Sequence, residues 1–151
     1  MKFLIIIFTL MCNIIFAQNL KELRNYLIKG EKSSAAAIQL MEKSEALFKQ
    51  NKLPIYKGFY SVGQFFMAKH AANPFKKLSY FKEGKKSLNH AIDSDSKNLE
   101  LRLFRLMTQE QAPAFLNYTD NIKEDRSFIL KNYENETDED LKIFIKKYLK
   151  K

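Results

Sequence analysis

Residues 74–107 read PFKKLSYFKEGKKSLNHAIDSDSKNLELRLFRLM, and this stretch decides the fold of the chain. In its first part, apolar or small residues recur every three or four positions, which places them on one face of a helix. These residues are Leu78, Phe81, Gly84, Leu88, Ala91 and Ile92. Residues 93–98 are short and polar, which is typical of a turn. The part that follows is apolar nearly all round, so we expect a second helix that is mostly buried.

Three charged residues interrupt the second apolar helix: Glu100, Arg102 and Arg105. A buried guanidinium group needs carboxylate or carbonyl partners. The candidate carboxylates lie downstream and are Asp120, Glu124 and Asp125. One interpretation is a network of structural ion pairs formed by Glu100, Arg102 and Arg105 with Asp125. The other is an anion or substrate site, in which case the protein is an enzyme that uses Glu100, Arg102 and Arg105.

The centre of this stretch resembles a tetratricopeptide (TPR) repeat at the point where one repeat runs into the next. The matching residues are Gly84, Leu88, Ala91, Ile92, Asp95, Asn98 and the run 99–102. Ser96 stands where that family usually has a proline. The wider run, with residues 73–75 and 113–118, also resembles small secreted helical proteins of Gram-negative bacteria. The resemblance implies stacked helical hairpins and no particular activity.

The spacing of helix starts predicts the architecture. Apolar periodicity and capping residues place these starts near residues 33, 54, 74 and 98, about twenty residues apart. Helix pairs therefore repeat at about forty residues, as in an array of antiparallel hairpins with short loops. No stretch alternates as a β-strand would. We predict an all-α, TPR-like fold, with residues 18–151 forming a single domain.

The first seventeen residues predict a secretory signal peptide. Lys2 precedes an almost unbroken apolar run over residues 3–16, which is too short to span a bilayer and is followed by a plausible cleavage point after Ala17. Cleavage there removes Cys12, the only cysteine, so the mature protein has no disulfide or thiol chemistry. We therefore expect a periplasmic or secreted protein.

Residues 137–150 predict a C-terminal amphipathic helix. Thr137 is the expected N-cap and Asp140 completes a capping box. Leu141, Phe144, Ile145, Tyr148 and Leu149 form the apolar face, and the lysines opposite are Lys142, Lys146, Lys147 and Lys150. One interpretation is a closing helix that covers the end of the array. The other is a basic helix that lies on an anionic membrane.

The chain shows no pattern that is specific for catalysis. Its two histidines, His70 and His90, lack metal-ligand neighbours on their own helices, so we expect no metal and no cofactor. The net charge of +9 favours an acidic partner or an anionic surface. A nucleic acid partner is not expected for a secreted protein.

These observations lead to one functional prediction and one main alternative. The prediction is a helical adaptor or scaffold module that binds an unidentified protein partner and has no catalytic activity. The residues expected to bind that partner are Tyr56, Tyr60, Lys82 and Lys86. The alternative is a basic protein that binds anionic membranes or polyanions through Lys142, Lys146, Lys147 and Lys150.

Overall fold

The computed structural model describes residues 2–150, with side chains from residue 14 onward, and this part of the chain holds helices and no strand. The α-helices are α1 (Lys2–Gly30), α2 (Ser34–Asn51), α3 (Pro54–His70), α4 (Pro74–Ser94), α5 (Leu99–Gln111), α6 (Ile122–Asn132) and α7 (Glu139–Leu149). Two 3-10 turns, Ala114–Leu116 and Tyr133–Asn135, flank α6. The all-α prediction is confirmed.

Capping residues set the helix starts. The Ser33 hydroxyl accepts a hydrogen bond from the Ala36 amide at 3.3 Å, and Pro54 occupies the first turn of α3. Asn73 caps α4 and Asn98 caps α5, each through its side-chain oxygen. The predicted starts near residues 33, 54, 74 and 98 are therefore confirmed within one residue.

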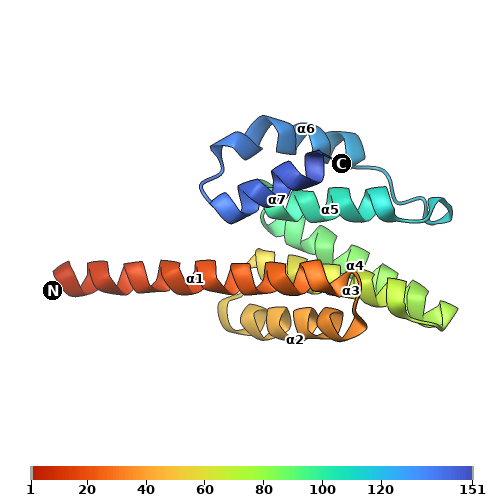
Figure 1. Ribbon diagram of the computed structural model, residues 1–151, viewed down its shortest axis with the longest axis horizontal. Coiled ribbons are helices and arrows are strands. Elements are labelled where there is room, and N and C mark those ends of the chain that lie inside the picture. Colours follow the sequence, from red (N-terminus) through yellow and green to blue (C-terminus); the bar gives the residue numbers. More distant parts are fainter. Residues whose placement is uncertain (1, 151) are drawn as a thin grey trace.

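The helices form two layers around α3. Helices α1 to α4 pack in sequence, α1 on α2, α2 on α3 and α3 on α4, while α5 packs mainly on α6. In Figure 1, α5, α6 and α7 lie on one side of the molecule, α1 and α2 lie on the other, and α4 crosses between them. Two apolar clusters fill the layers. One joins α1, α2, α3, α4 and one face of α5, and the other joins the opposite face of α5 to α6 and α7.

Two glycines allow α3 to approach its neighbours closely. A Cβ atom at Gly84 would lie 3.2 Å from the Ser61 carbonyl oxygen and 3.3 Å from the Phe65 ring. A Cβ atom at Gly58 would lie 2.2 Å from a methyl carbon of Leu101. The helices pack at distances that leave no room for a side chain at either position.

Helix α1 runs without interruption from residue 2 to Gly30. The helix is continuous across Ala17, the residue after which the sequence predicts cleavage. Side chains of residues 1–13 lie outside the described part, and the cleavage remains a prediction. No described helix is both long enough and apolar enough to cross a membrane.

The start of α7 corrects one prediction. Asp138, not Thr137, is the N-cap, and its carboxylate accepts a hydrogen bond from the Leu141 amide at 3.1 Å. The Thr137 amide instead donates to the side chain of Glu136 at 2.8 Å. A carboxylate at this position also stabilises the positive end of the helix, which a hydroxyl does less well.

Candidate functional site

Asp125 brings together the two arginines of α5. Its carboxylate accepts hydrogen bonds from Arg105 Nε at 2.6 Å and Nη2 at 2.8 Å, and from Arg102 Nη1 at 2.8 Å. The Asp125 side chain is fully buried, and Arg105 is nearly so. Arg102 also donates to Glu124 at 2.6 Å. Of the three candidate carboxylates, Glu124 and Asp125 are therefore the ones that pair with these arginines.

Glu100 belongs to a second cluster, which the sequence did not predict. Arg24 on α1 donates to both Glu100 oxygens, at 2.7 and 2.8 Å, and also to Asp138 at 2.8 Å. One guanidinium thus joins α1, α5 and the start of α7. No local pattern could indicate this pairing, because Arg24 and Glu100 are 76 residues apart.

The pKa values of this cluster follow from burial and pairing. Burial alone lowers the pKa of Arg24, but its two carboxylate partners outweigh burial and hold the pKa above its ordinary value. Burial raises the pKa of Glu100 despite the opposing bonds from Arg24, which by itself favours a protonated acid. The raised pKa of Arg24 favours an ion pair, whereas the raised pKa of Glu100 favours a neutral acid. The geometry decides for the ion pair, because both Glu100 oxygens accept hydrogen bonds from Arg24.

The buried charged groups of these two clusters are not placed to act on a substrate. Glu100, Arg105 and Asp125 are enclosed, and none of them lines either of the two recesses described below. A general acid or base must reach the atom that it protonates or deprotonates. The arrangement is that of structural ion pairs.

The histidines and carboxylates do not form a metal site in the described residues. A ring nitrogen of His70 lies 2.8 Å from the Gly30 carbonyl oxygen, so this side chain ties α3 to the end of α1. His90 is exposed on α4.

The predicted partner-binding residues do not form one surface. Tyr56 is 1 % exposed, because α1 covers that face of α3 and the Phe16 ring lies against the Tyr56 ring at 6.2 Å. Its assignment to a binding surface was therefore wrong. Tyr60 is half-buried, while Lys82 and Lys86 are exposed on α4. The α3 pattern, which is apolar over a wide arc, could not show which helix covers Tyr56.

The apolar face of α7 is also occupied. Leu141 and Ile145 are buried against α5 and α6, so α7 cannot offer these side chains to a membrane. Lys142 lies 3.7 Å from Glu139, whereas Lys146, Lys147 and Lys150 are exposed. Any attraction of α7 to an anionic surface therefore rests on these lysines and on the exposed Ile143, and not on the buried apolar face.

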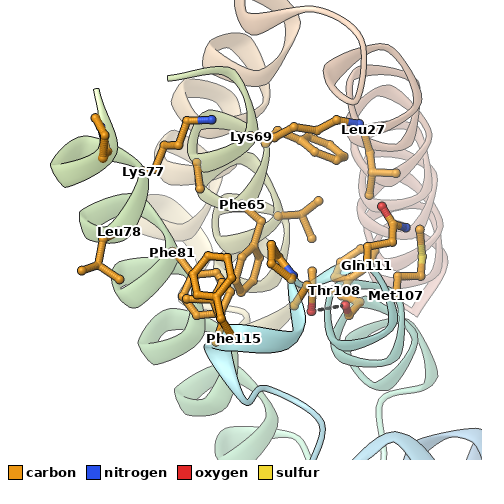
Figure 2. Close-up of a pocket in the computed structure, with 18 residues that line it drawn as sticks. Leu27, Phe65, Lys69, Lys77, Leu78, Phe81, Met107, Thr108, Gln111 and Phe115 are labelled. Atoms are coloured by element: carbon orange, nitrogen blue, oxygen red, sulfur yellow. Dashed lines mark hydrogen bonds between the residues drawn. The ribbon is translucent and has the colours of Figure 1, made fainter. Parts of the chain in front are cut away.

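A cavity of about 700 Å³ lies among α3, α4, α5 and the first 3-10 turn. Figure 2 shows Leu78 and Phe81 of α4 on one side, Leu27 of α1 on the other, and Phe115 across the end near α5. The lining is mainly aliphatic and aromatic. The charged groups among its lining residues are Lys69 and Lys77.

An aromatic cluster supports the closed end of this cavity. The Phe65 and Phe81 rings meet edge to face at 5.5 Å, and Tyr118 packs on both, at 6.2 and 5.6 Å. Lys85 lies over the Tyr118 ring at 4.8 Å. Burial raises the pKa of Tyr118 to about 12, so the phenol stays neutral.

A second recess, a groove of about 840 Å³, separates α1 from α7. We call it the α1–α7 groove. Its floor includes Leu27, Phe66, Met107 and Phe144, and its rim carries several charged side chains from both helices. Leu27, Phe66 and Met107 also line the cavity, so these side chains form the wall between the two recesses.

The cavity is lined mainly by apolar side chains, whereas the α1–α7 groove combines apolar side chains with charged ones, among them the buried Arg24. Compared with protein-family models, curated proteins and solved structures, the chain has no match.

Proposed function

We propose that this protein is a helical protein-interaction module, without catalytic activity, that binds a partner protein in the α1–α7 groove. The N-terminal apolar segment suggests that it works in the periplasm or outside the cell. The observation that carries the proposal is a groove between α1 and α7, two helices with little direct backbone contact, whose lining combines apolar side chains with several lysines. The TPR-like spacing of the hairpins supports the same role, since such arrays present concave binding surfaces.

Exposed apolar side chains mark the centre of the proposed interface. Ile28 on α1 is 59 % exposed and Ile143 on α7 is 62 % exposed, and both line the groove. They lie above a floor that includes Phe66 and Phe144. Protein interfaces have this anatomy, with an apolar centre and a polar rim. A groove between two helices with an apolar lining suits one amphipathic helix of a partner, docked by its apolar face.

The charge of the rim indicates the chemistry of that partner. Lys21 lies 3.8 Å from Asp140, and Glu31 lies 3.6 Å from Lys69, which is weak pairing at exposed positions. In the described part of the chain, no carboxylate pairs with the remaining lysines of the rim, which are Lys29, Lys32 and Lys147. An amphipathic helix with acidic residues beside its apolar stripe fits this rim.

The test is site-specific photo-crosslinking in the organism that makes the protein. A photoreactive amino acid at Ile143 should give one discrete adduct with an acidic partner, and mass spectrometry identifies it. The control is Ile38, which is 42 % exposed on α2 and lines neither recess. Equal adducts from both positions, or none from Ile143, would contradict the proposal.

A binding measurement with the identified partner completes the test. Ile143→Asp should weaken binding by tenfold or more, because it places a charge at the apolar centre. Ile38→Asp should change the affinity less than twofold. Both variants should have the same urea midpoint as the unchanged protein, because both side chains are exposed.

A second candidate function is binding to an anionic membrane surface through α4. Phe75 is 83 % exposed at the start of α4, and Lys76 and Lys77 follow it on the surface. Exposed aromatic and basic residues together are typical of peripheral membrane binding. Sedimentation with anionic liposomes checks it: binding should be lost at high salt and in Phe75→Ser. Sedimentation that is unchanged by salt would rule out this candidate.

A further inference from the structure

We propose that the cavity among α3, α4 and α5 binds a long-chain fatty acid, with its alkyl chain inside and its carboxylate at Lys69 and Lys77. This site is separate from the α1–α7 groove, and nothing in the protein-interaction proposal requires it. Three properties of the cavity carry the inference: the nature of its walls, the place of its two charges and its size.

The walls favour an alkyl chain. Phe65, Phe66, Phe81, Phe104 and Leu116 line the cavity together with Val62 and Met107. The Thr108 hydroxyl is already used, since it donates to the Phe104 carbonyl oxygen at 2.8 Å. A polar ligand would lose its hydrogen bonds to water on entering, and apart from Thr108 and Gln111 the uncharged lining side chains could not replace them. An alkyl chain has no such groups to satisfy, and it gains free energy with each methylene group that it buries.

The two lysines select an anionic head. In Figure 2, Lys69 of α3 and Lys77 of α4 both lie at the end of the cavity opposite Phe81 and Phe115, with Lys69 directed toward α1. Lys69 is 57 % exposed and pairs with Glu31 only at 3.6 Å, so its ammonium group is able to turn to another anion. Long lysine side chains readily bury their stems and hold the charge in water. A carboxylate beside either ammonium group stays hydrated while its alkyl chain enters the cavity.

The size of the cavity agrees with a ligand of this class. Its 700 Å³ lies within the range of about 300–1,000 Å³ that small-molecule sites span. Phe115 lines it and yet is 84 % exposed, and Leu78, which is 41 % exposed, also lines it. A bound chain would cover both side chains, which otherwise present apolar surface to water.

Displacement of a dansyl-labelled undecanoic acid from the full chain tests the proposal. Saturated fatty acids of 8 to 16 carbons should displace the probe, with affinity rising about two- to fourfold for each added methylene. Methyl palmitate and lysophosphatidylcholine should compete at least tenfold less well than palmitate, because neither carries a net negative charge.

Two matched variants show whether Lys77 holds the head. Lys77→Glu should weaken palmitate binding by tenfold or more. Lys76→Glu makes the same change in net charge one residue away, outside the cavity lining, and should change the affinity less than twofold. Both residues are exposed, so both variants should fold. Ala68→Phe, which fills the cavity from α3, should abolish binding while circular dichroism stays unchanged.

Several outcomes would overturn the proposal. They are affinity that does not depend on chain length, equal effects of the two lysine variants, preference for lysophosphatidylcholine, or no displacement at all. Sedimentation velocity tests whether a second copy of the chain occupies the cavity instead. A dimer that Ala68→Phe dissociates would mean that a second copy of the chain fills the cavity.

Discussion

Asp125 holds two helices together with one side chain. Its two oxygens accept three hydrogen bonds from Arg102 and Arg105, and no part of its side chain reaches solvent. A buried carboxylate of this kind adds little net stability when its partners are intact. Removal of the Asp125 carboxylate is costly, because the Arg105 guanidinium then stays buried without a counter-charge.

We therefore expect Asp125→Ala to destabilise the protein by about 3–5 kcal/mol. Urea unfolding followed by circular dichroism measures this loss. Glu124→Ala is the matched control, because Glu124 also pairs with Arg102 but its side chain is 60 % exposed. Its loss should be about 0.5 kcal/mol or less. Equal losses for the two variants would contradict the role of burial.

Asp138 gives the protein a pH dependence in acid. Burial alone raises the pKa of Asp138, but hydrogen bonds from Arg24 and the Leu141 amide outweigh it and hold the pKa below its ordinary value. A carboxyl whose pKa is lowered on folding stabilises the protein above its unfolded pKa of about 4, and this contribution is lost as the pH falls through the folded value.

The unfolding free energy should therefore fall as the pH drops below about 4, and it should fall less steeply in Asp138→Asn. Urea midpoints measured at pH values from 6 down to 2 give the two slopes. The Asp140→Asn variant is the control, since Asp140 is exposed and lies 3.8 Å from Lys21. A slope for Asp138→Asn equal to that of the unchanged protein would contradict this assignment.

The sequence allowed part of this residue-level picture to be predicted. Arg105 and Asp125 lie close enough along the chain for a hairpin of helices to bring them together. The candidate carboxylate partners of Arg105 could therefore be limited to three residues. Arg24 and Glu100 are 76 residues apart and meet only because the fold brings α1 beside α5. The spacing of residues along the sequence does not predict such a contact. The prediction that Tyr56 belongs to a binding surface was wrong for the same reason, since its neighbour Phe16 lies in a different helix.

At the scale of the helices, starts were predictable and contacts were not. Ser33, Pro54, Asn73 and Asn98 act locally, through backbone groups a few residues away. The α1–α7 groove depends on how α1 and α7 stand relative to each other, and the cavity depends on how α4 stands relative to α3 and α5. The relative placement of helices comes from side-chain packing between the layers. The apolar periodicity of the sequence does not show which helices pack together.

The α3–α5 contact offers a sharp test of packing between helices. Gly58→Ala improves helix propensity by about 1 kcal/mol but pushes a methyl group against Leu101, and overpacking costs about 1–3 kcal/mol. The variant should be less stable than the unchanged protein. Leu101→Ala should lose about 2–5 kcal/mol by itself. The double variant should lose at least about 1 kcal/mol less than the two single losses together, because one change fills the space that the other opens.

At the scale of the whole molecule, α1 is part of the fold from about Leu20 onward. Leu20, Leu23 and Leu27 lie in the core, and Arg24 reaches the other layer. Before Leu20, the described side chains are mostly exposed, and the contact of Phe16 with Tyr56 is the main exception. The predicted cleavage point after Ala17 therefore lies just outside the core.

A chain that begins at Gln18 should fold and lose about 0.5–1.5 kcal/mol, the contribution of one aromatic pair. A chain that begins at Asn25 should not fold, because it lacks Leu20, Leu23 and the partner of the buried Glu100. Circular dichroism and urea midpoints compare the two. Folding of the shorter chain would show that α1 is dispensable.

The unbroken course of α1 through Ala17 has a consequence for the predicted cleavage after that residue. Peptidases act on extended backbone, and the bond after Ala17 lies inside a helix that Leu20 and Leu23 fasten to the core. A folded precursor would have to unwind about two turns to expose that bond. If the predicted cleavage after Ala17 takes place, it should therefore be faster on a chain that has not yet folded than on the folded precursor.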